Sequence, residues 1–151
     1  MEIHQIYTML RLIAIVLPLF FAWEMLQAPA FAGMPSDWWG SAVICGKATL
    51  GDVVIVLALF GIGMLVGRDV RWFARPKRGP YLAIVLVGIG VQVAVEWAAL
   101  RTGRWSYTAW HPTLPPLGTG LFPVLQAVLF PLTFGFLALW ERRRPSSAPD
   151  P

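Results

Sequence analysis

The chain has 151 residues, of which 57% are hydrophobic and only 13% charged, and its formal net charge is +4. Ordinary soluble domains carry about 25% charged residues, so this composition excludes a typical water-soluble fold. The basic excess does not indicate nucleic-acid binding either, because the Lys and Arg residues flank long apolar blocks and form no basic or aromatic-interleaved surface.

Four apolar blocks follow one another along the chain. Each is about as long as the helix of roughly 20 residues that crosses the hydrocarbon core of a bilayer. The predicted spans lie near 6–26, 48–67, 81–99 and 120–140. We therefore expect an all-α integral membrane protein, a four-transmembrane-helix bundle that forms one domain over 1–144, followed by a disordered tail at 145–151.

The first block has an alternative interpretation as a cleaved signal peptide. Ala30-Phe31-Ala32 is a small-x-small pattern of the kind that signal peptidases cleave. Trp23 and Glu24 argue against cleavage, because a signal peptide prefers plain aliphatic residues at such positions. We expect this block to remain as the first span, whereas cleavage would leave three spans and an external N-terminus.

Positive charges predict the orientation, because Lys and Arg beside a short-looped span resist translocation. Most of them lie beside the termini or between the second and third spans, namely Arg11, Arg68, Arg71, Arg75, Lys77, Arg78, Arg142, Arg143 and Arg144. Lys47, Arg101 and Arg104 fall on the other side. We therefore expect both termini in the cytoplasm, with the protein in the inner membrane of a bacterium.

Polar residues inside the spans gather near the predicted outer side, roughly 5–12 Å below the boundary at about 1.5 Å per residue. This polar layer contains Glu24, Asp52 in the second turn of its span, Gln92, Glu96 and Gln126. A charge in hydrocarbon costs at least about 2.5–3.5 kcal/mol, so the three acids should face one another. Three such carboxyls cannot all ionise, and at least one should hold a transferable proton, as a general acid does.

These residues also have a structural interpretation, because polar side chains in membranes often join helices by hydrogen bonds worth about 0.6–2 kcal/mol. That interpretation suits Gln92 alone. For the three acids we favour a functional site, since Ser or Asn would join the helices without an ionisation cost. Glu96 has a further alternative, an outward position paired with Arg101 or Arg104.

The segment between the third and fourth spans has the composition of a folded cap over the polar layer. It contains Gly103-Arg104-Trp105-Ser106-Tyr107 and then Trp110-His111-Pro112. The catalytic residues that we expect are Glu24, Asp52 and Glu96, and the expected substrate-binding residues are Gln27, Gln92, Arg104, Trp105, Tyr107, His111 and Gln126.

Glycines and prolines in the spans predict local features of the bundle. Gly63-Met64-Leu65-Val66-Gly67 is a small-xxx-small pattern that lets helices approach closely. Pro123 and Pro131 each free a carbonyl and predict a kink around Gln126 in the fourth span.

Cysteine and histidine are too scarce to suggest a cofactor or a metal. Cys45 is the single cysteine, which rules out an internal disulfide and a cysteine-based metal cluster. His4 lies at the N-terminus and His111 in a predicted loop, so the spans offer no histidine pair for haem or a metal. We therefore expect neither a metal nor a cofactor, and no phosphate-binding loop or Ser/His/Asp set is present.

The stretch from Glu96 to Gln126 resembles the small integral-membrane lycopene cyclase domain, in which an acid is followed by a Gly-x-Trp-aromatic loop, a proline and paired acids. Here these are Glu96, Gly103-Arg104-Trp105-Ser106-Tyr107 and Pro123-Val124-Leu125-Gln126. The membrane carotenoid hydratases are similar in combining an intramembrane glutamate with a Gly- and Tyr-containing loop. The paired acids of the family fall on Leu125 and Gln126, so any proton donor must come from the acids of the polar layer.

Three functions fit these features. The first is an enzyme acting on an isoprenoid or similar membrane lipid, because protonating a polyene needs a poorly solvated acid, and carboxylates and aromatic faces stabilise the cation. The second is a proton- or cation-coupled carrier that works as a homo-oligomer and uses the same acids. The third is a non-catalytic accessory subunit that docks on a larger membrane complex through the polar layer.

Overall fold

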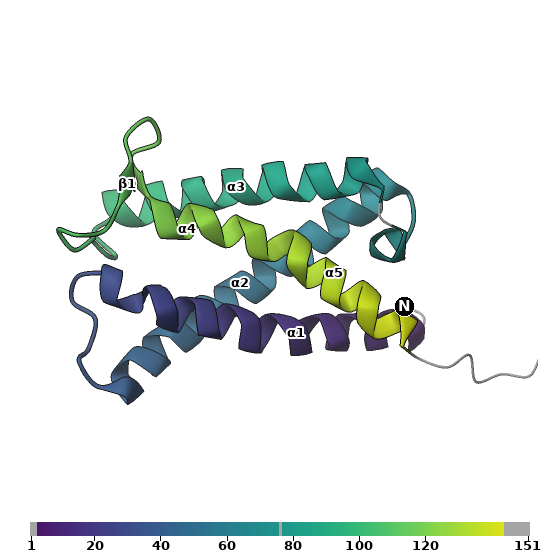
Figure 1. Ribbon diagram of the computed structural model, residues 1–151, viewed down its shortest axis with the longest axis horizontal. Helices are drawn as coiled ribbons and strands as arrows, with labels where there is room; N and C mark the ends of the chain where they lie inside the picture. The colour runs from purple at the N-terminus through teal and green to yellow at the C-terminus, as the bar shows by residue number, and fades with distance from the viewer. Residues whose placement is uncertain (1–2, 76, 144–151) are drawn as a thin grey trace, which may run out of the picture.

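The computed structural model describes residues 3–75 and 77–143, and most of them are helical (Figure 1). The long helices are α1 (Ile3–Gln27), α2 (Trp38–Gly67) and α3 (Arg78–Arg101). A fourth helical segment consists of α4 (Leu121–Leu125), the 3₁₀ turn η3 (Gln126–Val128) and α5 (Leu129–Arg142). The remaining elements are the 3₁₀ turns η1 (Ala28–Ala30) and η2 (Trp72–Ala74) and the antiparallel strands β1 (Thr113–Leu114) and β2 (Thr119–Gly120).

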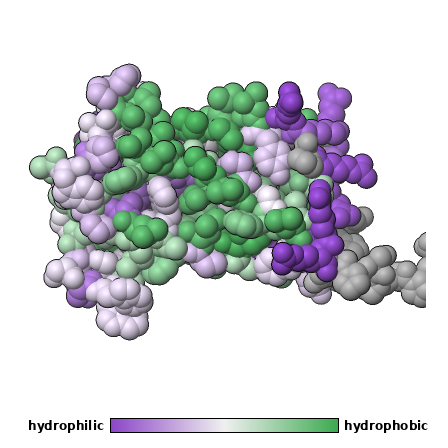
Figure 2. Space-filling view, in the orientation of Figure 1, coloured by the Kyte–Doolittle hydropathy of each residue, from purple (hydrophilic) through white to green (hydrophobic). Residues whose placement is uncertain are grey.

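Four helical stretches are long and apolar enough to span a membrane, and each overlaps one predicted span. They cover Gln5–Ala30, Trp38–Gly67, Arg78–Arg101 and Leu121–Arg142. The surface coloured by hydropathy shows an apolar band between two more polar ends (Figure 2). The prediction of four helices with the length and composition of membrane spans is therefore confirmed.

The second helix begins at Trp38, well before the predicted start of its span at 48. Asp37 caps it, because its side chain accepts a hydrogen bond from the Gly40 N–H at 2.8 Å. The helix has 30 residues and crosses the others diagonally (Figure 1). Asp52 lies about 21 Å along it, at about 1.5 Å per residue, so the prediction of a second-turn position is wrong. The charge of Lys47 interrupts the hydropathy of this segment, so a span placed by hydropathy alone begins too late.

The fourth helical segment changes geometry at Gln126, where the prolines predict a distortion. Pro131 has no N–H to bond the carbonyl of Ala127, and the N–H of Leu129 bonds the carbonyl of Gln126 in 3₁₀ geometry. The turn η3 therefore lies between the two prolines, flanked by the last residues of α4 and the first residues of α5. This turn places the side chain of Gln126 in the interior, where it is 3% exposed.

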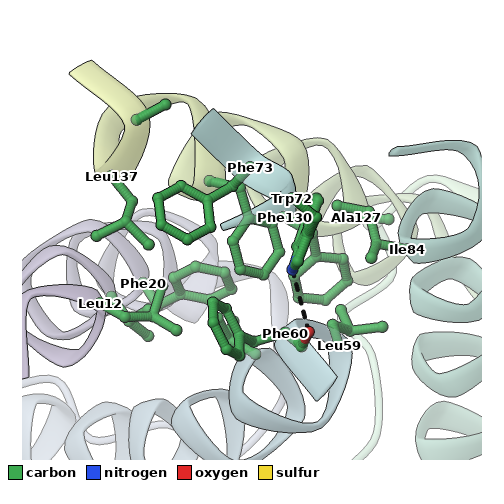
Figure 3. Close-up of a cluster of buried hydrophobic side chains, with 14 residues drawn as sticks. Leu12, Phe20, Leu59, Phe60, Trp72, Phe73, Ile84, Ala127, Phe130 and Leu137 are labelled. Atoms are coloured by element: carbon green, nitrogen blue, oxygen red, sulfur yellow. Dashed lines mark hydrogen bonds between the residues drawn. The ribbon is translucent and has the colours of Figure 1, made fainter. Parts of the chain in front are cut away.

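An apolar core joins all four helical segments and η2 (Figure 3). Phe20 stacks on Phe130 with ring centroids 5.8 Å apart. Trp72 enters from η2, lies 4.8 Å from the ring of Phe134, and donates its Nε1–H to the carbonyl of Phe60 at 3.2 Å. The indole N–H thus has a partner, as a buried tryptophan needs.

The glycine pair of α2 makes room for this tryptophan. A Cβ at Gly63 would lie 2.2 Å from the ring of Trp72, and a Cβ at Gly67 would lie 2.8 Å from the Trp72 Cβ. At Gly63 a side chain from the following turn therefore fills the space, whereas a Cβ at Gly67 would also lie 3.3 Å from Pro80 of α3, so the predicted close approach of two helices is confirmed only at Gly67. Another close helix contact occurs at Gly88 of α3, where a Cβ would lie 2.5 Å from Phe130.

The two ends of the bundle differ in charge. The start of α1, the end of α5 and the connection between α2 and α3 lie at one end, which we call the basic end (Figures 1 and 2). Its described basic residues are Arg11, Arg68, Arg71, Arg75, Lys77, Arg78, Arg142 and Arg143. The opposite end, with η1, β1, β2 and the loop 102–119, is called the polar end. Arg144 and the predicted tail at 145–151 lie outside the described residues.

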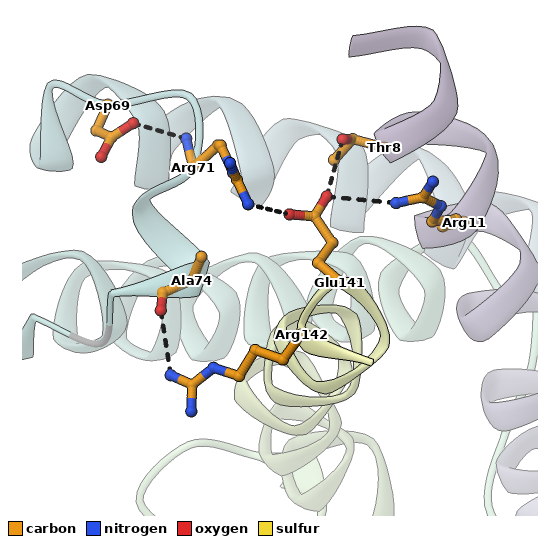
Figure 4. Close-up of polar contacts among 7 residues, drawn as sticks. All are labelled: Thr8, Arg11, Asp69, Arg71, Ala74, Glu141 and Arg142. Carbon is orange, nitrogen blue, oxygen red and sulfur yellow. Dashed lines mark hydrogen bonds and ion pairs between the residues drawn. The ribbon is translucent and has the colours of Figure 1, made fainter. Parts of the chain in front are cut away.

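Glu141 of α5 ties the basic end together (Figure 4). Its carboxylate accepts a hydrogen bond from the Thr8 hydroxyl at 3.1 Å, and it forms ion pairs with Arg11 at 3.7 Å and Arg71 at 3.2 Å. These partners come from α1 and from the connection between α2 and α3. One acid thus joins three segments that are distant in the sequence.

Candidate functional site

Glu96 lies near the end of α3 with its side chain buried under the loop that follows. Its Oε2 accepts hydrogen bonds from the Tyr107 hydroxyl and, at 3.4 Å, from the Trp105 Nε1–H. The Tyr107 hydroxyl in turn accepts one from the backbone N–H of Gly120 at 2.8 Å. Burial and the hydrogen bond to Glu96 raise the pKa of Tyr107 above its ordinary value, so the phenol stays protonated and keeps donating.

The chain folds over Glu96 because α3 ends in a tight reversal at Gly103. This glycine has a φ of 67°, in the left-handed region that favours glycine. The next residue, Arg104, donates its backbone N–H to the carbonyl of Ala99 at 2.9 Å, which closes the end of the helix. The reversal sends Trp105 and Tyr107 back over the helix that carries Glu96.

Backbone hydrogen bonds hold the loop against the end of α1. Phe31 and Tyr107 form an antiparallel bridge, and the Ala32 N–H donates to the carbonyl of Ser106 at 2.8 Å. The carbonyl of Ala30 accepts from the backbone N–H of Thr108 at 3.0 Å and from its hydroxyl at 3.1 Å. The segment after α3 is therefore a structured cap, as its composition predicts.

An aromatic cluster forms the underside of this cap and consists of Phe31, Trp105, Tyr107, His111 and Phe122. Phe31 lies edge-on to Trp105 and to His111, with centroids 6.2 and 5.5 Å apart. The imidazole of His111 lies 4.2 Å from the Tyr107 ring and 4.9 Å from the Phe122 ring. Phe31 and Phe122 were not among the predicted site residues, because nothing in their local sequence indicates contact with a loop so distant in the chain.

A second group of hydrogen bonds links α1, α2 and η3. The Gln27 side-chain N–H donates to Glu24 at 2.8 Å and, more weakly, to the Gln126 Oε1 at 3.5 Å. The Gln126 Nε2 donates to the Asp52 Oδ1 at 2.7 Å. Two acids expected to be catalytic are thus linked through two glutamines expected to bind the substrate.

The two groups lie close together at the polar end. Glu24 is within electrostatic range of both Glu96 and Asp52, so negative charges on these side chains would repel one another. Gln92, one turn before Glu96, is 5% exposed, and its Nε2 makes no hydrogen bond to any described residue. The structure therefore brings the three acids, Gln92 and Gln126 toward one interior region.

Arg104 is the predicted binding residue that the structure leaves outside. Its side chain is exposed and lies over the outer face of the Trp105 ring, 5.7 Å from the centroid. Glu96 is only 4% exposed and faces the cap, so the alternative of an outward position paired with Arg101 or Arg104 is not what the structure shows. Arg104 lies outside because the reversal at Gly103 turns the next side chain away from the helix.

Two apolar grooves open on the flanks of α5, away from the acids. The larger, of about 900 Å³, lies between α1 and α5 and is lined by Ile15, Pro18, Leu19, Ala22, Phe136, Leu139, Trp140 and Arg143. The smaller, of about 410 Å³, lies between η2, α3 and α5. Neither groove is lined by a residue of the polar layer.

Among residues 3–75 and 77–143, no group of three or more His, Cys, Asp or Glu side chains is arranged to hold a metal ion. No protein-family model, curated protein or solved structure matches the chain. A function for this chain is therefore inferred from the residues at the polar end.

Proposed function

We propose that this protein is a small membrane enzyme that acts on an isoprenoid or similar lipid, with Glu96 as its proton donor. The observation that carries the proposal is a buried carboxyl held by the Tyr107 hydroxyl and the Trp105 indole beneath a cluster of aromatic rings. A poorly solvated carboxylic acid is the group needed to protonate a carbon–carbon double bond. The proton would form a new C–H bond while the double bond opens to a carbocation.

The surroundings of Glu96 suit such a cation. The faces of Phe31, Trp105 and Tyr107 carry negative π density, which attracts positive charge more strongly when water is excluded. Glu24 and Asp52 supply further carboxyls within electrostatic range of one another. Loss of a proton from a neighbouring carbon to a carboxylate would then complete a cyclisation or isomerisation. The resemblance of 96–126 to the lycopene cyclase domain points to the same chemistry.

The proposal includes an orientation with the basic end in the cytoplasm and the polar end toward the outer side of a bacterial inner membrane. The asymmetry of Lys and Arg supports it. The small-x-small triplet is built into the fold, because Ala30 is fully buried and its carbonyl accepts from Thr108 and His111. This supports retention of the first span. A lipid substrate would enter such a site sideways from the bilayer.

A proton- or cation-coupled carrier is the second candidate, and one observation favours it. The hydrogen-bonded series Glu24, Gln27, Gln126 and Asp52 connects ionisable groups on two helices through two amides. Intramembrane acids linked in this way are typical of proton and ion pathways. In this role several copies of the chain would work together.

The deciding experiment compares the lipids and pigments of cells with and without the gene. A changed isoprenoid supports the enzyme, and its restoration by the wild-type chain but not by Glu24→Gln or Asp52→Asn would assign those acids to the chemistry. An unchanged lipid profile with altered tolerance to ions or solutes supports the carrier. If neither changes but a larger complex loses stability, the chain is an accessory subunit, and the enzyme proposal fails.

A further inference from the structure

We infer that His111 is the hydroxyl-binding group of this site, and that its Nε2 accepts a hydrogen bond from the O–H of a neutral ligand, either water or an alcohol group on a lipid. The inference rests on the proposed function for the kind of lipid involved. It specifies that the polar part of the ligand is uncharged and carries a hydroxyl.

The first step is the tautomer of the imidazole. The His111 Nδ1 lies 3.2 Å from the carbonyl oxygen of Ala30, and a carbonyl oxygen can only accept. Nδ1 must therefore carry the proton. In the neutral ring the other nitrogen, Nε2, is then an acceptor with a free lone pair.

The second step is that this lone pair is buried and has no partner among the described residues. His111 is only 5% exposed, and its Nε2 makes no hydrogen bond. A buried polar atom left without a partner costs about 1–3 kcal/mol. Rotation cannot relieve this cost, since the ring is held by Tyr107, Phe122 and the edge of Phe31.

The third step is that the backbone of Gly120 lies close beside Nε2. A Cβ on Gly120 would lie 2.5 Å from Nε2 and 2.8 Å from the Tyr107 ring, so any larger residue at this position would collide with the imidazole. The hydroxyl of Thr119, which precedes Gly120 in β2, is also fully buried without a partner among the described residues.

Charge specifies the ligand further. The basic side chains nearest the polar end, Lys47, Arg101 and Arg104, are all exposed. The buried ionisable neighbours are acids, with Glu96 within electrostatic range of His111. A phosphate or diphosphate would enter without a buried counter-charge and would face these carboxyls, which is costly. A neutral hydroxyl avoids that cost and can donate to Nε2.

The test uses the full chain in nanodiscs of zwitterionic lipid, with ¹⁵N-labelled histidine and the variant His4→Gln, so that His111 is the one histidine observed. Nitrogen NMR should show the neutral tautomer protonated at Nδ1, with Nε2 a hydrogen-bonded acceptor. Geranylgeraniol is then added as the neutral alcohol and geranylgeranyl diphosphate as its anionic counterpart. A shift of Nε2 with the alcohol alone identifies a lipid hydroxyl. A hydrogen-bonded Nε2 that neither probe alters identifies water.

The variant His111→Phe should weaken geranylgeraniol binding about tenfold, the effect of losing about one hydrogen bond, if the lipid supplies the hydroxyl. If water supplies the hydroxyl, His111→Phe should leave the binding of both probes unchanged and should remove the Nε2 signal. Arg104→Gln is the matched control and should change neither result. A proton on Nε2, or equal or tighter binding of the diphosphate, would overturn the inference. If one of these contrary results is found but deletion of the gene still changes an isoprenoid, only the inference about His111 fails and the enzyme proposal stands. If the NMR result is as predicted but deletion of the gene changes no lipid, only the enzyme proposal fails.

Discussion

The hydrogen bond between Gln126 and Asp52 allows a quantitative test of the polar layer. Gln126→Met keeps the length of the side chain and removes the amide that donates to the Asp52 Oδ1 at 2.7 Å. Asp52 is 6% exposed, and its other oxygen already has no partner among the described residues. The single change therefore leaves a whole carboxyl without a hydrogen bond and should lower the free energy of unfolding by about 1–3 kcal/mol.

The reverse change, Asp52→Leu, leaves the Gln126 amide without its best acceptor and should cost a similar amount. When both partners become apolar groups of similar shape, neither polar group remains unpaired, and the pair of changes can be nearly neutral. The double variant should therefore be more stable than the sum of the singles predicts. We expect a coupling free energy of about 1–3 kcal/mol.

The measurement is reversible unfolding in mixed detergent micelles as the SDS fraction rises, followed by tryptophan fluorescence. Thr133→Val provides the control, because its hydroxyl bonds the Leu129 carbonyl of its own helix and shares no hydrogen bond with Asp52. Combined with Asp52→Leu, it should give additive losses. If Gln126→Met combined with Asp52→Leu also gives additive losses, the two side chains do not interact, and the expected coupling is contradicted.

Three further predictions follow from other parts of the structure. Gly63→Ala should lower the free energy of unfolding by about 1–3 kcal/mol in the same assay, because the new methyl overlaps the neighbouring indole, whereas Gly61→Ala, with open space around it, should not. Absorbance titration should show that the pKa of Tyr107 lies above the ordinary tyrosine value of about 10. Because its folded pKa is raised, its contribution to stability should persist below about pH 10 and disappear as the pH rises further, and Tyr107→Phe should abolish that dependence. Reporter fusions after Arg78 should be cytoplasmic and fusions at His111 external, and an external Arg78 would contradict the orientation.

Hydropathy and the cost of buried charge predict much of this molecule from its sequence. The four long apolar helices follow from the length of the apolar blocks, and the convergence of Glu24, Asp52 and Glu96 follows from the high cost that three acids would have in apolar surroundings. These are properties of single residues in a bilayer, so no knowledge of the partners is needed. Gln126 could be placed among them because it lies at a similar depth in the fourth apolar block.

Features that depend on distant contacts could not be predicted in this way. The space at Gly63 is filled by Trp72, which belongs to the next turn, so the motif alone suggests the wrong partner. Phe31 meets the cap only because the loop after α1 pairs with residues more than 70 positions later. Arg104 has a suitable charge for a binding residue but is turned outward by the reversal at Gly103.

Glu96 is the proposed proton donor, and its isosteric replacement tests that role directly. Glu96→Gln keeps an oxygen that can accept from Tyr107 and Trp105 but has no transferable carboxyl proton. It is introduced into cells lacking the gene, beside the wild type and the control Arg104→Gln, and the isoprenoid product and the amount of membrane-bound protein are measured together. We expect Glu96→Gln to accumulate like the wild type and form no product, while Arg104→Gln restores product formation. Full product formation by Glu96→Gln would contradict the claim and leave Glu96 with a structural role.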